Sequence, residues 1–154
     1  MVFGRARPRA PERFPPARMY WLALGATAVA AGFDMRSKEI PNTISIVLGL
    51  AALIAAALGL HPLPWWDIAL GFGVAFGGSF LLFALGVLGG GDVKLLAALG
   101  LTLGLRAFLP FVLITSVAGG ALALLALRRG RTEIAYAPAM LVGLLLPIPF
   151  VLMA

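Results

Sequence analysis

Long apolar stretches separated by short polar ones dominate the chain from residue 19 onward. Apolar residues run almost without interruption over six stretches, 19–33, 43–60, 68–88, 93–104, 108–127 and 135–153. A helix needs about 20 mostly apolar residues to cross the hydrocarbon core of a bilayer. We therefore predict an all-α, polytopic membrane protein with about six transmembrane helices.

Composition agrees with this prediction. Of the 154 residues, 62% are hydrophobic and 12% are charged, against about a quarter charged in soluble domains; the mean hydropathy is +1.04. The chain has no cysteine and one histidine, His61. Disulfides, thiol nucleophiles and cysteine- or histidine-rich metal sites are therefore excluded, and we predict neither a metal nor another cofactor.

The first eighteen residues differ from the rest. The net charge is +6, and five of the twelve basic residues are arginines in this segment. A stretch rich in Pro and Arg without an apolar period is expected to be disordered. We expect residues 1–18 to form a disordered basic tail, attracted to anionic membrane lipids, and residues 19–154 to form one membrane domain. Aromatic residues are not interleaved with these arginines, so the tail does not indicate binding to nucleic acid.

Two alternatives concern the start of the chain and its orientation. The arginines followed by 19–33 also fit a cleaved secretory signal, although several more spans follow.

Six spans place the loops 34–42, 89–94 and 128–133 on one side of the membrane, with six basic residues, whereas the opposite side has Arg106 alone. The positive-inside rule makes these loops cytoplasmic in a multi-pass protein of the inner (plasma) membrane. The arginines of the tail favour the opposite orientation.

Aromatic residues mark several span ends. Tyr20 and Trp21 begin the first apolar stretch, and Trp65 and Trp66 follow a proline before the third. Tyrosine and tryptophan are typical of the lipid headgroup level. We interpret these residues as an interfacial belt and His61 as a further interfacial side chain.

Two carboxylates stand at span ends on the same predicted side. Asp34 ends the first stretch, and Asp92 follows three glycines. A charge at the edge of a membrane span is a candidate for function, although Asp92 also suits a simple helix cap. Two neighbouring carboxylates can share one proton, so that one takes a proton from water while the other donates to a carbonyl oxygen. This is the chemistry of aspartic proteolysis.

The residues around both acids resemble the type IV prepilin peptidases, membrane aspartic proteases of the G-x-G-D class. The matching residues are Asp34-x-Arg36 through Ile40-Pro41-Asn42, followed by Gly89-x-Gly91-Asp92-x-Lys94. The resemblance implies six transmembrane helices, Asp34 and Asp92 as the catalytic pair, and cytoplasmic-face cleavage of the basic leader from a pilin-like precursor. Larger relatives add a cysteine zinc domain and methylate the new terminus. Without cysteine, this chain resembles the small, peptidase-only branch.

The other motif residues are expected to support the pair. These are Gly89, Gly91, Lys94, Arg36, Pro41 and Asn42. Lys94 and Arg36 would orient the carboxylates or the substrate, or simply anchor the protein at the cytoplasmic surface, while Asn42 or Thr43 would cap the next helix.

Tyr136 and Pro138 lie where relatives carry a motif before the last helix. They are expected to line the substrate site, with helix initiation by Pro138 as the simpler alternative.

Helix dipoles divide the roles of the two acids. Asp92 should begin a helix, whose positive end favours the ionised form, and Asp34 should feel the negative end of another. We therefore expect Asp92 to be the base and Asp34 the protonated acid. The rival function is a small membrane transporter or channel subunit that binds a cation at both acids, but the spans contain few polar residues. A non-catalytic assembly scaffold is a third reading.

Overall fold

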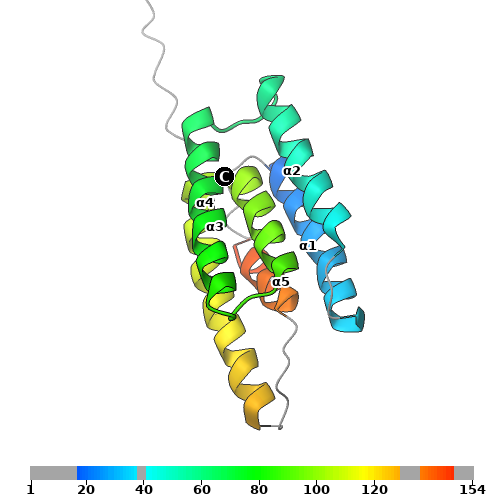
Figure 1. Ribbon diagram of the computed structural model, residues 1–154. Helices are drawn as coiled ribbons and strands as arrows, with labels where there is room; N and C mark the ends of the chain where they lie inside the picture. The colour runs from blue at the N-terminus through cyan, green and yellow to red at the C-terminus, as the bar shows by residue number, and fades with distance from the viewer. Residues whose placement is uncertain (1–16, 38–40, 129–135, 148–154) are drawn as a thin grey trace, which may run out of the picture.

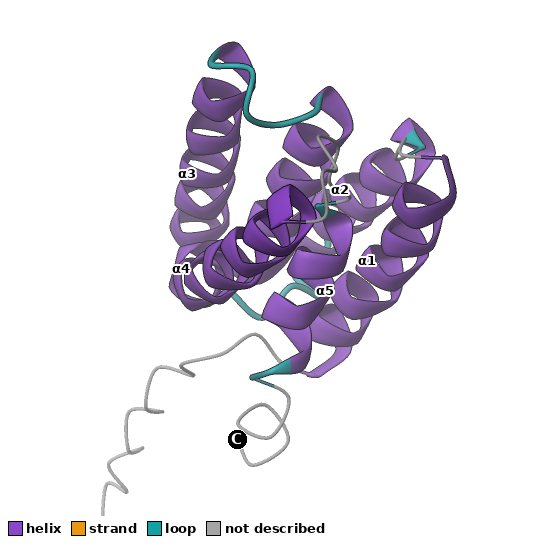
Figure 2. Cartoon of the chain, turned by 90° about the horizontal axis from the view of Figure 1, so that it is seen from below, coloured by secondary structure: helices purple, strands orange, loops and turns teal. Residues whose placement is uncertain are grey.

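Every element in the described part of the computed structural model, residues 17–37, 41–128 and 136–147, is an α-helix (Figures 1 and 2). The helices are α1 (Ala17–Ser37), α2 (Asn42–Ala57), α3 (Trp65–Ala84), α4 (Gly90–Arg128) and α5 (Ala137–Leu145). The all-α prediction is confirmed. Most of the expected basic tail lies outside the described residues, but Ala17 and Arg18 begin α1 and are helical.

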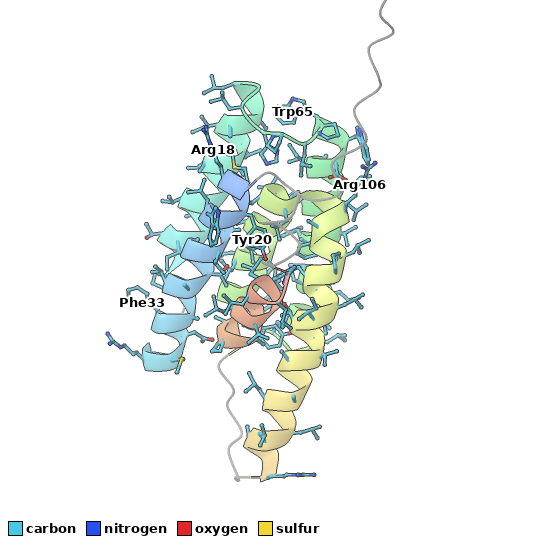
Figure 3. All side chains as sticks on the ribbon, turned by 180° about the vertical axis from the view of Figure 1, so that it is seen from behind. Arg18, Tyr20, Phe33, Trp65 and Arg106 are labelled. Carbon is cyan, nitrogen blue, oxygen red and sulfur yellow. The ribbon has the colours of Figure 1, made fainter. Side chains whose placement is uncertain are left out.

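Helix α4 consists of two helical segments joined at Gly104. Gly104 has φ 68° and ψ 173°, and positive φ is a conformation that favours glycine. The chain turns back there, so that both segments reach Tyr136. Tyr136 contacts Gly119 in the second segment and interacts electrostatically with Asp92 in the first. Figures 1 and 3 show the two segments as separate rods. The break falls between the predicted stretches 93–104 and 108–127.

Two segments of the described residues are long and apolar enough to cross a membrane. They are Trp65–Ala84 and Gly90–Ala126, and Asn42–Ala57 is a shorter apolar helix. The outer face of α3 carries exposed phenylalanines, with ring centroids 5.7 Å apart from Phe72 to Phe76 and again from Phe76 to Phe80. Such a face suits lipid. These helices support a membrane protein, whereas six spans stay a prediction.

Glycines allow α3 and α4 to pack with their backbones in contact. A methyl group on Gly71 would lie 2.5 Å from the carbonyl oxygen of Gly100, and one on Gly100 would lie 2.5 Å from the Ala75 side chain. Small residues permit this close approach between membrane helices. The first segment of α4 thereby reaches the centre of the bundle, where Leu95 and Leu99 are fully buried.

The other glycines of α3 do not lie at this contact. A methyl group on Gly73, Gly77 or Gly78 would meet no described atom within 4 Å. Glycine spacing predicts a contact face, but it does not tell which glycines of a helix meet the neighbour.

Two side chains expected at the membrane interface are buried instead. Tyr20 is 3% exposed, points into the bundle (Figure 3) and donates its hydroxyl hydrogen to the Leu144 carbonyl oxygen of α5. His61 is 8% exposed, and its Nδ1 accepts the Leu63 N–H at 3.2 Å. Both predictions were wrong because these polar groups find partners inside the protein. Trp65 is exposed and lies at the same end of the bundle as Arg106 (Figure 3).

A third carboxylate, Asp67, supports the turn at Gly104. Asp67 lies in the first turn of α3, is 1% exposed, and its Oδ2 is 2.5 Å from where a Gly104 methyl group would stand. The Nε of Arg106 lies 4.0 Å from Asp67 Oδ1, and the guanidinium stacks 5.1 Å above the Trp66 ring. These side chains meet at the junction of α3 and α4, at the end of the bundle away from Asp34 and Asp92.

Candidate active site

The first acid, Asp34, is held by the start of α5. Asp34 lies one turn before the end of α1 and is 7% exposed. Its Oδ2 accepts a hydrogen bond from the main-chain N–H of Ala137 at 2.8 Å. Ala137 is the first residue of α5 and Pro138 the second, and the first N–H groups of a helix have no partner within it. The carboxylate thus lies at the positive end of α5.

The second acid, Asp92, lies in the first turn of α4, two residues after the helix begins at Gly90. A backbone hydrogen bond from Gly89 reaches its carboxylate, and the Val93 N–H bonds the Gly89 carbonyl oxygen at 3.2 Å. An acid in this position that bonds back to the residue before the helix forms half of a capping box. Asp92 Oδ1 is buried without a hydrogen-bond partner among the described residues, so one oxygen stays available.

The structure brings these two acids together from distant parts of the sequence. The carboxyl end of α1 and the amino end of α4 lie at the same end of the bundle, the lower end in Figure 1. The carboxylates of Asp34 and Asp92 interact electrostatically. Like charges that sit close together favour a state in which the pair holds one proton.

Tyr136 links the pair to the second segment of α4. A methyl group on Gly119 would lie 2.6 Å from Tyr136 Cε2, so the glycine forms the notch that receives the ring. Burial raises the pKa of the Tyr136 phenol above its ordinary value of 10.0; a hydrogen bond with the Ser116 side chain lowers it, and the charge of Asp92 raises it further. Tyr136 therefore lies within electrostatic reach of Asp92, while the next residue holds Asp34.

Two supporting residues make a contact that sequence reasoning did not predict. The Nζ of Lys94 donates to Asn42 Oδ1 at 2.8 Å, and thereby joins the amino ends of α4 and α2. Asn42 does not cap α2, because Pro41 occupies the cap position without a side-chain bond. Lys94 therefore bonds a side-chain amide here, and its role in orienting the carboxylates or the substrate stays a prediction.

The remaining motif residues shape the helix ends. Gly89 precedes α4, Gly91 is half-buried in its first turn, and Pro138 is half-buried at the start of α5. Arg36 is exposed in the last turn of α1 and forms no ion pair with a described residue. No group of three or more potential metal ligands occurs in the described part of the chain. Lys38, Glu39 and Glu133, charged residues of the predicted loops 34–42 and 128–133, lie outside the described residues.

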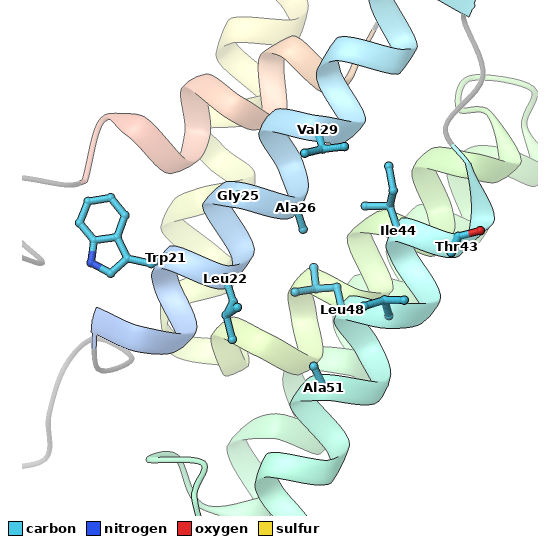
Figure 4. A pocket seen from close by; sticks show the side chains of 10 residues that line it. Trp21, Leu22, Gly25, Ala26, Val29, Thr43, Ile44, Leu48 and Ala51 are labelled. Carbon is cyan, nitrogen blue, oxygen red and sulfur yellow. The ribbon is translucent and has the colours of Figure 1, made fainter.

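An apolar groove lies apart from the acids. It runs between α1 and α2 (Figure 4), has a volume of about 470 Å³, and is lined by residues from Trp21 to Val29 and from Thr43 to Ala51. Neither Asp34 nor Asp92 lines it. The chemistry of the acids, rather than the size of this groove, therefore identifies the candidate site.

Sequence reasoning missed the main-chain donor at Ala137 and the notch at Gly119. A main-chain N–H has no letter in the sequence, and the pair Gly119-Gly120 reads only as a packing face. Pro138 was the one available signal, because proline is typical of the first turn of a helix.

The bundle is all-helical and carries two interacting, largely buried carboxylates at one end. Such a pair can act as general acid and general base on a peptide. A family model for the type IV leader peptidase family matches residues 21–124, and the chain belongs to this family.

Two curated relatives are both named prepilin leader peptidase/N-methyltransferase. The protein from Xanthomonas campestris pv. campestris is 30% identical over 115 residues, which cover 66% of this chain and 40% of the relative. The protein from Bacillus subtilis is 34% identical over 126 residues, covering 77% of this chain and 50% of the relative. The chain thus matches half or less of the length of these relatives. No solved structure matches it significantly.

Proposed function

We propose that this chain is a membrane aspartic endopeptidase that removes the basic leader from type IV pilin-like precursors. The observation that carries the proposal is the pair Asp34 and Asp92, which approach each other at one end of the bundle. Membership of the type IV leader peptidase family and the names of the two relatives support the substrate. The proposal concerns peptidase activity and leaves the methyltransferase part of the relatives' name aside.

The pair performs the reaction with water as the nucleophile. The ionised acid takes a proton from water, whose oxygen attacks the carbonyl carbon of the scissile peptide, while the protonated acid donates to the carbonyl oxygen. Proton transfer to the amide nitrogen then allows the C–N bond to break. The products are a carboxyl terminus on the leader and a new amino terminus on the pilin, and the pair recovers its single shared proton.

The proposal includes six membrane spans and a cytoplasmic active site. The spans are α1, α2, α3, the two segments of α4, and a last span that begins with α5. Arg36, Lys94 and Arg128 belong to helix ends at the same end of the bundle as the acids, whereas Arg106 lies at the other end. By the positive-inside rule, the end with the acids faces the cytoplasm, where a basic leader would remain.

Co-expression with a candidate pilin precursor tests the function. Asp34→Asn and Asp92→Asn keep side-chain size but remove an ionisable group, and each should reduce processing by at least about 100-fold. Asp67→Asn is the matched control, because it neutralises a buried acid at the far end of the bundle. Normal processing by both site variants would refute the protease and favour a transporter.

A further inference from the structure

We propose that the amino terminus of α5 positions the carboxylate pair and divides its roles, with Ala137 holding Asp34 as the ionised base and Asp92 acting as the protonated acid. This inference rests on the proposed protease function. It assigns a positioning role to a main-chain N–H group and reverses the roles expected from sequence.

The hydrogen bonds of the two acids carry the assignment. Asp34 accepts a main-chain N–H from a helix start at 2.8 Å, and such a donor stabilises a carboxylate more than a neutral carboxyl group. Asp92 keeps a buried Oδ1 without a partner among the residues described. An uncompensated buried oxygen is less costly on a neutral carboxyl group than on an anion. One shared proton therefore resides on Asp92.

The sequence expectation failed because it considered only the helices that contain the acids. Asp34 does end α1, but its side chain lies against the positive end of a different helix, α5. Asp92 does lie at the start of α4, but there its carboxylate accepts the backbone hydrogen bond of Gly89 and caps the helix. Tertiary packing thus gives Asp34 the positive end of a second helix, which its own helix does not supply.

Contacts on two sides keep α5 in place. Tyr136, directly before Ala137, inserts its ring at Gly119 of α4. The other end of α5 receives the Tyr20 hydroxyl at Leu144. The N–H of Ala137 is therefore a rigid donor, which is what positioning of a catalytic group requires.

The neighbouring charged groups do not offset this arrangement. Arg36 on α1 is exposed, and Lys94 on α4 is exposed and bonded to Asn42. The phenol of Tyr136 is neutral at physiological pH, because its ordinary pKa is 10.0 and burial raises it further. The difference between the two acids therefore arises from the Ala137 donor at Asp34 and from the buried, unpartnered Oδ1 of Asp92.

Replacing one amide by an ester tests the donor directly. Cell-free synthesis with lactic acid at position 137 exchanges the N–H for an oxygen and keeps the methyl side chain. The same exchange at Ala139 is the control, because its N–H bonds the Tyr136 carbonyl oxygen at 3.0 Å in the same turn. Leader cleavage is then measured against pH in detergent, with thermal unfolding as a check of folding.

The two limbs of the pH profile distinguish the roles. If Asp34 is the base, loss of its donor moves the acid limb of kcat/KM to higher pH. Cleavage on that limb then falls roughly tenfold or more, because a hydrogen bond to a charged group is lost. If Asp34 is instead the acid, only the alkaline limb moves to higher pH. That result, or an acid limb that matches the Ala139 ester, would overturn the proposal.

An ordinary substitution provides a second route. Gly119→Ala should push the Tyr136 ring and with it the α5 start, and move the acid limb in the same direction. Gly120→Ala is the control, since its methyl group meets no described atom within 4 Å. Identical profiles for Gly119→Ala and Gly120→Ala would contradict the positioning role. Failure of the protease function itself would appear separately, as normal processing by Asp34→Asn and Asp92→Asn.

Discussion

The side chain of Lys94 donates a hydrogen bond to Asn42 at 2.8 Å, across 52 residues of sequence. Lys94 follows Asp92 in the first turns of α4, and Asn42 begins α2, the next helix after the one that carries Asp34. The contact therefore ties together the two motifs of the resemblance. It joins the amino ends of α4 and α2.

This tie should be weak but measurable. Lys94→Met and Asn42→Ala should each destabilise the protein, with a coupling of about 0.5–1 kcal/mol in a double-mutant cycle. The coupling is small because both side chains are exposed. Unfolding in detergent micelles measures it. Additive effects of the two substitutions would show that the hydrogen bond contributes no stability.

The crossing of α3 and α4 should not tolerate a side chain at Gly71. Gly71→Ala should cost about 1–3 kcal/mol of unfolding free energy, because the added methyl group meets the Gly100 backbone, which cannot move aside. Gly73→Ala, two residues along the same helix, should be neutral or stabilising. Equal unfolding midpoints for the two variants would argue against this packing.

The hydroxyl of Tyr20 should matter more than its position near the helix start suggests. Tyr20→Phe leaves the Leu144 carbonyl oxygen without its donor, which should cost about 1–3 kcal/mol. Trp21→Phe changes an exposed neighbour and should have little effect. Thermal unfolding compares the two variants. A Tyr20→Phe protein as stable as Trp21→Phe would mean that the buried bond is dispensable.

His61 should make stability depend on pH. Burial lowers the pKa of His61 below its ordinary value of 6.5, against opposing contributions from the Thr102 carbonyl and Asp67. Below pH 6.5 the unfolded chain therefore binds a proton that the folded protein resists, so stability falls as pH decreases through this range. His61→Gln should flatten that decrease. Unfolding midpoints between pH 5 and 8 give the measurement, and an unchanged slope in the variant would contradict it.

Much of the architecture was predictable because apolar stretches and breakers are local signals. The break near Gly104, the helix start at Pro138 and the two acids at helix ends are each visible within a few residues of sequence. Side-chain partners are different. Tyr20 and His61 read as interfacial residues, yet both are buried, and the Tyr20 partner, Leu144, lies 124 residues away.

The sequence by itself determined that this is a helical membrane protein with two acids in motifs that resemble those of the type IV leader peptidases. Only the tertiary structure decided what surrounds each acid. Hydrophobicity and helix breaks act over one or two turns of chain, whereas the Asp34 donor comes from a main-chain N–H that lies 103 residues away. That N–H reaches Asp34 only after α1, α4 and α5 pack together.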